Sequence, residues 1–226
     1  YGAAGERCMA ISVALPVGDE TADRLIAKLI PRIEALKVGP YTSGNDVDYG
    51  PVVTAAAKAN ILKLVESGIE QGATLVVDGR NFSLQGYEDG FFVGPHLFDN
   101  VTPDMDIYKK EIFGPVLSTI RAGSYEEALG LAMSHEYGNG TAIYTRDGDT
   151  ARDFANRVNV GMIGINVPIP VPMAFHSFGG WKLSLFGDHH MHGMEGIRFY
   201  TRLKAVTSRW PSGARTDPEF VMPTLG

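Results

Sequence analysis

The fold is indicated first by residues 11–36, which read ISVALPVGDETADRLIAKLIPRIEAL. Residues 11–17 are apolar and partly β-branched, which is typical of a strand. A helical pattern then opens at Asp19, with apolar residues at positions 25, 26, 29, 30 and 33. Pro31 lies inside this helix, and we expect it to kink or interrupt the helix. The stretch therefore predicts a βα unit.

The same alternation of strands and helices continues along the chain. Further helices are predicted at about 52–71, 125–134 and 150–158, and further strands at 74–77, shortly after 90–95, and at 116–120, 141–145 and 162–167. Such alternation is typical of an α/β fold with a doubly wound, mostly parallel open sheet. A last stretch, 197–206, alternates enough to predict an edge strand. The dinucleotide fingerprint G-x-G-x-x-G is absent from the sequence.

Composition excludes several classes of protein. The chain has 226 residues, 44% of them hydrophobic and 20% charged, which is enough for one large or two small domains. The net charge of −6 argues against nucleic-acid binding, which needs clustered basic residues. No apolar run is long enough to span a membrane, and residues 1–10 do not have the pattern of a signal peptide.

Cys8 is the single cysteine, so it cannot form an internal disulfide, and it fits a reducing compartment. It lies in the run Gly5-Glu6-Arg7-Cys8, just before the first predicted strand. A thiolate is a nucleophile that nearby cations favour, and Arg7 is adjacent in sequence. A lone cysteine is also often a small buried apolar residue. Taken alone, Cys8 leaves both interpretations open.

Two motifs together resemble the aldehyde dehydrogenase superfamily. The Cys8 run resembles its Gly-x-x-Cys nucleophile loop, and Glu111-Ile112-Phe113-Gly114-Pro115 resembles its Glu-x-Phe-Gly-Pro motif. The resemblance implies that Cys8 is the catalytic thiol, that Glu111 binds the nicotinamide ribose hydroxyls of NAD, and that Phe113 lies against the nicotinamide ring. A carboxylate and an aromatic face suit these roles. The structural alternative for the second motif is a strand-entry turn with a buried Phe.

Three further stretches extend the resemblance from Gly5 to about Trp210. YGNGTA at 137–142 is similar to the family's Tyr-Gly-Leu-x-Ala segment, GMIGIN at 161–166 to its Gly-x-x-x-x-Asn strand, and FGGWKLS at 178–184 to its Phe-Gly-Gly-x-Lys-x-Ser motif. GERCMAIS at 5–12, INVPIPVP at 165–172 and the segment 199–210 are most similar to the CoA-acylating methylmalonate-semialdehyde dehydrogenase subfamily.

In that subfamily an arginine before the cysteine helps to bind the substrate carboxylate, and Arg7 occupies this place. A guanidinium group suits a carboxylate because it donates two parallel hydrogen bonds. The alternative is that Arg7 points to solvent or pairs with Glu6. Downstream, the Pro-rich run 168–172 predicts a rigid pocket wall, with Phe175 and Phe178 as its apolar lining. The alternative for this run is a polyproline segment that binds a partner.

No metal site is predicted at the three clustered histidines. His189, His190 and His192 lack a convincing partner set of other ligands, and the family uses no metal, so we expect a solvated or interface turn.

The chain begins at Tyr1 without an initiator methionine, and we expect it to be a fragment of a longer polypeptide. The resemblance implies a catalytic domain at 1–195, a C-terminal oligomerisation strand at 196–210 and a tail at 211–226. The NAD-binding domain, the glutamate general base and the oxyanion asparagine are expected upstream of Cys8, outside this chain. A homodimer or homotetramer is expected, in the cytoplasm, or in the mitochondrial matrix of a eukaryote.

The implied reaction is NAD-dependent oxidation of malonate or methylmalonate semialdehyde to an acyl-CoA, through a thioacyl enzyme and with loss of CO2. Three alternatives stay open. The first is a hydrolytic aldehyde dehydrogenase of other substrate range. The second is a cysteine hydrolase or acyltransferase that pairs Cys8 with one of the six histidines. The third is a non-catalytic interaction module.

Overall fold

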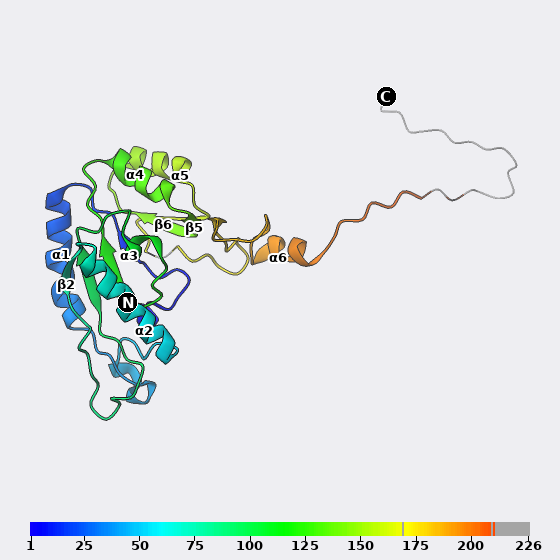
Figure 1. The fold of residues 1–226 in the computed structure, drawn as a ribbon. Helices are drawn as coiled ribbons and strands as arrows, with labels where there is room; N and C mark the ends of the chain where they lie inside the picture. Colours follow the sequence, from blue (N-terminus) through cyan, green and yellow to red (C-terminus); the bar gives the residue numbers. More distant parts are fainter. Residues whose placement is uncertain (169, 209, 211–226) are drawn as a thin grey trace, which may run out of the picture.

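The computed structural model describes residues 1–168, 170–208 and 210. Figure 1 shows a body of packed helices and strands, which the chain leaves through the last helix. The elements in order are η1 (Gly2–Gly5), β1 (Val13–Ala14), α1 (Asp19–Glu34), η2 (Tyr41–Asp46), α2 (Ala55–Glu70), β2 (Thr74–Val77), β3 (His96–Asp99), α3 (Asp106–Lys109), β4 (Val116–Thr119), α4 (Tyr125–Ser134), β5 (Tyr137–Gly138), β6 (Gly140–Ile143), α5 (Gly148–Arg157), β7 (Met162–Ile165), β8 (Trp181–Lys182) and α6 (Gly193–Tyr200).

The larger sheet has the strand order β1-β4-β3-β2. β4 runs parallel to both of its neighbours, β1 and β3, whereas β2 is antiparallel to β3. α1 packs on one face through Ile26 and Ile33 against Leu97, and α2 packs on the other face with Ile61 in the same core as Phe98. Because Leu97 and Phe98 are successive strand residues, they point to opposite faces. The sheet is therefore covered by helices on both sides.

A second layer is built around the parallel pair β6 and β7. α4 and α5 cover this pair with a small core of their own, which Figure 1 shows above the larger sheet. Its buried residues are Leu129, Phe154, Val158 and Val160. β5 pairs antiparallel with β8, which joins the segment after α4 to the loop before α6.

The α/β prediction and its mostly parallel sheet are confirmed, and helix α4 has the predicted bounds. The expected interruption at Pro31 was wrong, since α1 continues to Glu34. Pro31 has no N–H that could donate to the Ala27 carbonyl oxygen. Both residues face solvent, so this carbonyl is open to water. No helix among the described residues combines the length and the apolar character that a membrane span requires.

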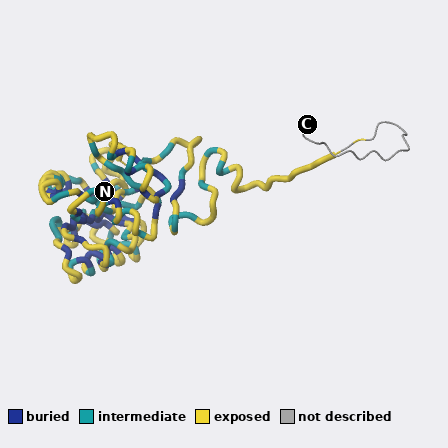
Figure 2. Tube along the Cα trace, turned by 90° about the horizontal axis from the view of Figure 1, so that it is seen from above, coloured by how far each residue is buried: buried dark blue, intermediate teal, exposed yellow. Residues whose placement is uncertain are grey.

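The prediction of a strand at 197–206 was wrong at its start, because Ile197–Tyr200 are the end of helix α6. Met194 and Ile197 are three residues apart, a helical spacing that the alternating pattern masked. Residues 201–208 form no strand in this chain, since none of the described segments lies beside them to complete the hydrogen-bond ladder. Figure 2 shows this segment exposed along its length.

Candidate active site

The loop that carries Cys8 is tied to the core at its start. The Tyr1 hydroxyl donates to the His96 carbonyl oxygen at 2.8 Å, and Ala4 is buried. A Glu6 carboxylate oxygen accepts a hydrogen bond from the Val53 N–H at 3.2 Å, just before α2. These contacts hold the loop against the larger sheet and α2, so its position does not depend on the nucleophile itself.

Cys8 is exposed, unlike the buried cysteine of the structural alternative. Its backbone is nevertheless held on both sides. The Ala10 N–H donates to the Arg7 carbonyl oxygen at 3.0 Å, which closes a turn with Cys8 and Met9 at its centre. The Asn139 Nδ2 donates to the Cys8 carbonyl oxygen at 2.7 Å. An accessible thiol on a fixed backbone is the arrangement that a covalent nucleophile needs.

Gly5 brings the cysteine loop into direct contact with the Glu-x-Phe-Gly-Pro motif. A Cβ atom at Gly5 would lie 2.0 Å from the Gly114 carbonyl oxygen, which leaves no space for any other residue. Gly5 also has a φ of +76°, in the left-handed region that favours glycine. Gly114 in turn packs on Ile61 of α2, where a Cβ would lie 2.6 Å from a side-chain carbon. The two motifs, more than a hundred residues apart in sequence, therefore form one surface.

Phe113 adopts a conformation that is unusual for an aromatic residue. Its φ is +52°, and its side chain is 43% exposed. A bulky residue in the left-handed region is strained, and such strain concentrates at functional sites. The exposed ring contradicts the alternative of a buried Phe and is free to contact a flat ligand.

Glu111 is also exposed, and it borders a polar hollow of about 560 Å³ beside α2. Among the described residues its carboxylate forms no ion pair, whereas the neighbouring Lys110 pairs with Asp106 at 2.9 Å. The carboxylate is therefore available to accept hydrogen bonds from the hydroxyls of a ligand.

The three remaining motifs join behind the cysteine loop. A Cβ at Gly161 would lie 2.1 Å from the Gly179 carbonyl oxygen, and one at Gly180 would lie 2.9 Å from the Asn139 Cα. The Lys182 Nζ donates to the carbonyl oxygens of Met133 and His135, at the end of α4, at 2.7 and 3.0 Å. The lysine of the Phe-Gly-Gly-x-Lys motif thus satisfies carbonyls that a helix end leaves unpaired.

The two predicted pocket residues Phe175 and Phe178 lie in the long loop before α6. Phe178 is half-buried and packs on His192 with ring centroids 5.4 Å apart, whereas Phe175 is 69% exposed and neighbours His176. The interactions found for both rings are with histidines rather than with the cysteine loop. Their substrate-binding role stays a prediction.

Arg7 forms no ion pair with Glu6, one of whose carboxylate oxygens instead accepts from the Val53 N–H. Arg7 is exposed, and it forms no ion pair with any residue that the structure describes. A free guanidinium next to an exposed thiol can hold the carboxylate of a substrate.

Three of the histidines are paired or buried away from Cys8. His189 pairs with Glu195 at 2.9 Å, and His190 lies 2.6 Å from the Ser177 Oγ. His96 is buried in β3, where burial lowers its pKa to about 4 and keeps it neutral. Within residues 1–168, 170–208 and 210, no histidine is hydrogen-bonded to the Cys8 thiol. No group of three or more potential ligands is arranged for a metal in the same residues.

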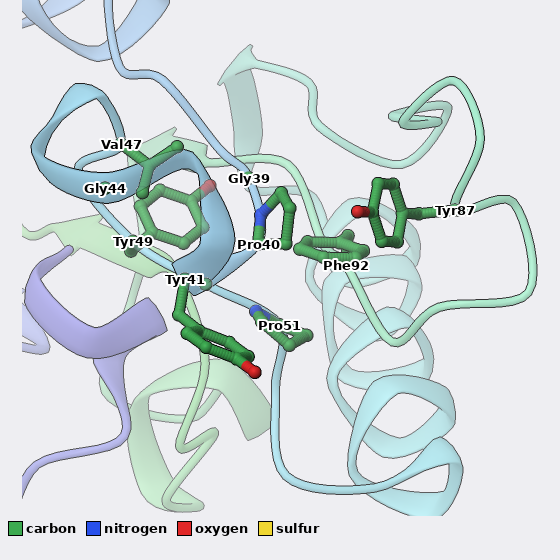
Figure 3. Close-up of a pocket in the computed structure, with 10 residues that line it drawn as sticks. Gly39, Pro40, Tyr41, Gly44, Val47, Tyr49, Pro51, Tyr87 and Phe92 are labelled. Atoms are coloured by element: carbon green, nitrogen blue, oxygen red, sulfur yellow. The ribbon is translucent and has the colours of Figure 1, made fainter.

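An aromatic cavity of about 540 Å³ lies apart from these groups (Figure 3). Tyr87 and Phe92 meet edge to face on one side of it, with ring centroids 6.1 Å apart, and Tyr41 and Tyr49 line the other. Its lining is entirely glycine, proline, valine and aromatic, so it offers no charged group. None of the predicted site residues lines it.

Comparison with known proteins follows the same motifs. A family model described as the aldehyde dehydrogenase family matches residues 1–206. The chain belongs to the aldehyde dehydrogenase family. It is 60% identical to a malonate-semialdehyde dehydrogenase of Pseudomonas aeruginosa and 44% identical to a mitochondrial methylmalonate-semialdehyde/malonate-semialdehyde dehydrogenase of Bos taurus that is named as acylating. Both alignments cover all of this chain, but only 45% and 42% of those relatives.

A solved structure agrees with the sequence relatives. It is assigned as a methylmalonate-semialdehyde dehydrogenase of Sinorhizobium meliloti complexed with NAD, with 69% identity and a TM-score of 0.92. The match covers 95% of this chain and 43% of that one. The chain therefore spans less than half of the length of the family members it matches.

Asn139 was not among the site residues predicted from the sequence. Asn139 contacts Cys8 across the molecule, although YGNGTA was matched only as a family segment. A signal was present, because Asn139 stands where the quoted Tyr-Gly-Leu pattern has an apolar residue. An amide in place of leucine indicates a hydrogen bond to be made.

Proposed function

We propose that the full-length protein carrying this chain oxidises malonate or methylmalonate semialdehyde to an acyl-CoA, with Cys8 as the nucleophile. The observation that carries the proposal is the exposed Cys8 thiol in a loop packed on the Glu111–Phe113 motif, next to Arg7, which has no ion-pair partner among the described residues. Residues 1–195 would be the catalytic domain. The general base, the oxyanion asparagine and the NAD-binding domain would lie upstream in the polypeptide.

The chemistry assigned to this chain is covalent. The Cys8 thiolate attacks the aldehyde carbon, and a C–S bond forms as the carbonyl electrons move to oxygen. The Cys8 backbone N–H can donate to that oxygen. Loss of the aldehyde hydrogen with its electron pair restores the carbonyl and leaves a thioester on Cys8. The thiolate of CoA then takes the acyl group and releases the Cys8 thiolate. The substrate carboxylate leaves as CO2, and the α carbon takes up a proton in its place, which gives acetyl-CoA or propionyl-CoA.

The residues present fit the nicotinamide part of NAD. The strained, exposed Phe113 offers an aromatic face, and the exposed Glu111 carboxylate offers acceptors for two ribose hydroxyls. NAD, when bound, supplies the hydride acceptor. Both side chains would orient the ring, and neither would take part in bond making.

The arm after β7 supports an assembly of several subunits, a homodimer or homotetramer. Large apolar side chains are exposed along it, among them Met194, Ile197, Tyr200 and Leu203. Figure 1 shows α6 and the following segment projecting from the body, which leaves these side chains largely exposed. Exposed apolar surface of this extent marks interaction sites. We place the protein in the cytoplasm, or in the mitochondrial matrix if its source is a eukaryote; the name of the Bos taurus relative gives that protein as mitochondrial.

One assay tests the proposal. The full-length protein is incubated with malonate and methylmalonate semialdehydes, with and without NAD and CoA, and NADH and acyl-CoA are measured. We expect both products only when NAD and CoA are present together. NADH and a free carboxylic acid without CoA would indicate the hydrolytic alternative, and turnover without NAD would contradict the assignment altogether.

Arg7→Lys is expected to raise KM for malonate semialdehyde about tenfold while leaving KM for propanal nearly unchanged. Lysine keeps the positive charge but cannot donate two parallel hydrogen bonds to a carboxylate. Steady-state kinetics with both aldehydes measure the difference. An equal effect on both substrates would mean that Arg7 does not recognise the carboxylate.

Glu111→Gln is expected to slow hydride transfer at least about tenfold, with little change in the affinity for NAD. The reason is that Glu111 would contact only the nicotinamide ribose, whereas the adenine end would bind elsewhere in the full-length protein. Single-turnover absorbance of NADH measures the rate, and calorimetry measures the affinity. A large loss of affinity with a normal rate would show that Glu111 anchors the cofactor instead of orienting it.

A further inference from the structure

We infer that Asn139 is a positioning residue that locks the turn carrying the nucleophile. The inference rests on the proposed role of Cys8. It starts from a single long-range hydrogen bond, in which the Asn139 Nδ2 donates to the Cys8 carbonyl oxygen at 2.7 Å across 131 residues of sequence. Only the amide nitrogen can donate to a carbonyl, so this contact also determines which way the Asn139 amide is oriented.

The effect of this hydrogen bond follows from the place of the accepting Cys8 carbonyl in a tight turn. The Ala10 N–H donates to the Arg7 carbonyl oxygen, so residues 7–10 form a β-turn in which Cys8 and Met9 are the central residues. The Cys8 carbonyl belongs to the central peptide of that turn. Central peptides distinguish the type I from the type II turn, and exchanging the types rotates ψ of the first central residue by roughly 150°. In this protein that residue is the nucleophile.

Asn139 opposes such a flip because it is itself held firmly. Its carbonyl oxygen accepts from the Met162 N–H at 3.1 Å, and its Cα packs on the backbone of Gly180. The preceding Gly138 pairs with Trp181 between β5 and β8. The donor is therefore part of the layer of β6 and β7, and it fixes the turn from outside the loop.

Gly140, the residue after Asn139, packs against the same turn. Met9, the other central residue, is nearly buried, and a Cβ at Gly140 would lie 2.5 Å from the Met9 Cε. The Asn139 Nδ2 also lies 3.3 Å from the Met9 Sδ. Asn139 and Gly140 thus hold both central residues of the turn, one by a hydrogen bond and the other by leaving space for a side chain.

The consequence for the reaction is orientation of the thiol. With the Arg7 carbonyl and the Cys8 carbonyl both anchored, the two peptide planes that flank Cys8 are held, and so is the direction of its Cα–Cβ bond. A nucleophile displaced by about 1 Å can lose on the order of a hundredfold in rate. Asn139 thus acts through Cys8, without contact with the substrate.

The test uses the full-length protein with Asn139→Leu, which removes the amide at similar size, and Tyr125→Phe as the matched control. Tyr125→Phe also removes one hydrogen bond from the same layer, to Asp153 at 2.7 Å, but lies between α4 and α5. We expect Asn139→Leu to lower the single-turnover rate with semialdehyde by about tenfold to a hundredfold. The affinity for NAD and the melting temperature should match those of the control.

A second variant separates positioning from stability. In Asn139→Asp the ionised carboxylate cannot donate to the Cys8 carbonyl, whereas the protonated acid can. The single-turnover rate, relative to wild type at the same pH, should therefore recover as the pH is lowered from about 6 towards about 4, through the ordinary pKa of an aspartic acid. If Asn139→Leu does not fold, this pH dependence decides the question.

Two outcomes would overturn the inference: a rate decrease smaller than threefold in Asn139→Leu, or an Asp variant whose relative rate is independent of pH. Cys8→Ala, assayed beside these variants, keeps the proposed function separate. If Cys8→Ala is inactive while Asn139→Leu is normal, only the role of Asn139 fails. If Cys8→Ala is active, the proposed function fails.

Discussion

Cys8→Ala in the full-length protein is expected to lower the rate of aldehyde oxidation by several orders of magnitude while leaving the fold intact. Without the thiolate no covalent intermediate forms, and removal of a covalent nucleophile has effects of this size. The fold should survive because the Cys8 side chain is exposed and the hydrogen bonds of the turn come from backbone atoms and from Asn139. NADH formation measures the rate, and thermal unfolding measures the stability.

Iodoacetamide provides the control for this experiment. Because Cys8 is the only cysteine of this chain, alkylation of the chain should stop in Cys8→Ala, and alkylated wild-type protein should be as inactive as the variant. More than a tenth of the wild-type activity in Cys8→Ala would contradict the assignment of the nucleophile.

Gly5→Ala is expected to be the most damaging substitution outside the reacting groups. The new Cβ would lie 2.0 Å from the carbonyl oxygen and 2.6 Å from the carbonyl carbon of Gly114, and backbone atoms cannot move aside as a flexible side chain would. The φ of +76° adds a cost of about 1–2 kcal/mol for a residue with a side chain. Overpacking typically adds about 1–3 kcal/mol, so we expect a destabilisation of about 3 kcal/mol.

The activity of Gly5→Ala should fall by more than about a hundredfold, because the clash separates the cysteine loop from the Glu111–Phe113 motif. Gly2→Ala is the matched control, since Gly2 lies in the same short helix η1 and a Cβ there meets nothing within 4 Å. Chemical denaturation and steady-state kinetics compare the two variants. Equal stability and activity in both would show that the Gly5–Gly114 contact is unimportant.

Much of the fold was accessible from local patterns. The helices α1, α2 and α4 were predicted at about 19–36, 52–71 and 125–134, the first two from apolar residues at helical spacing. Two of them begin at the side-chain caps Thr54 and Ser124. The error at 197–200 arose where the described part of the chain packs no strand or sheet against the segment. The apolar residues of this short segment fit both a helical and an alternating spacing. Its own backbone hydrogen bonds therefore determined its structure, and it formed a helix.

The residues of the candidate site also divide into those that the sequence predicted and one that it did not. Cys8, Arg7, Glu111 and Phe113 were found because their chemistry and their motifs are visible in the sequence, and the structure shows all four exposed. Asn139 was missed, because its partner is a backbone carbonyl of Cys8 and any residue has such a carbonyl. No residue type marks that acceptor.

The sequence by itself indicated the candidate reacting groups, the alternation of strands and helices, and the family to which the chain belongs. Tertiary structure alone decided that Gly5 lies against Gly114 and that Asn139 reaches Cys8. Hydrophobic periodicity indicates which face of an element is buried, but it does not indicate which loops come into contact. Such meetings depend on how the two covered sheets pack, and packing is a property of the whole chain.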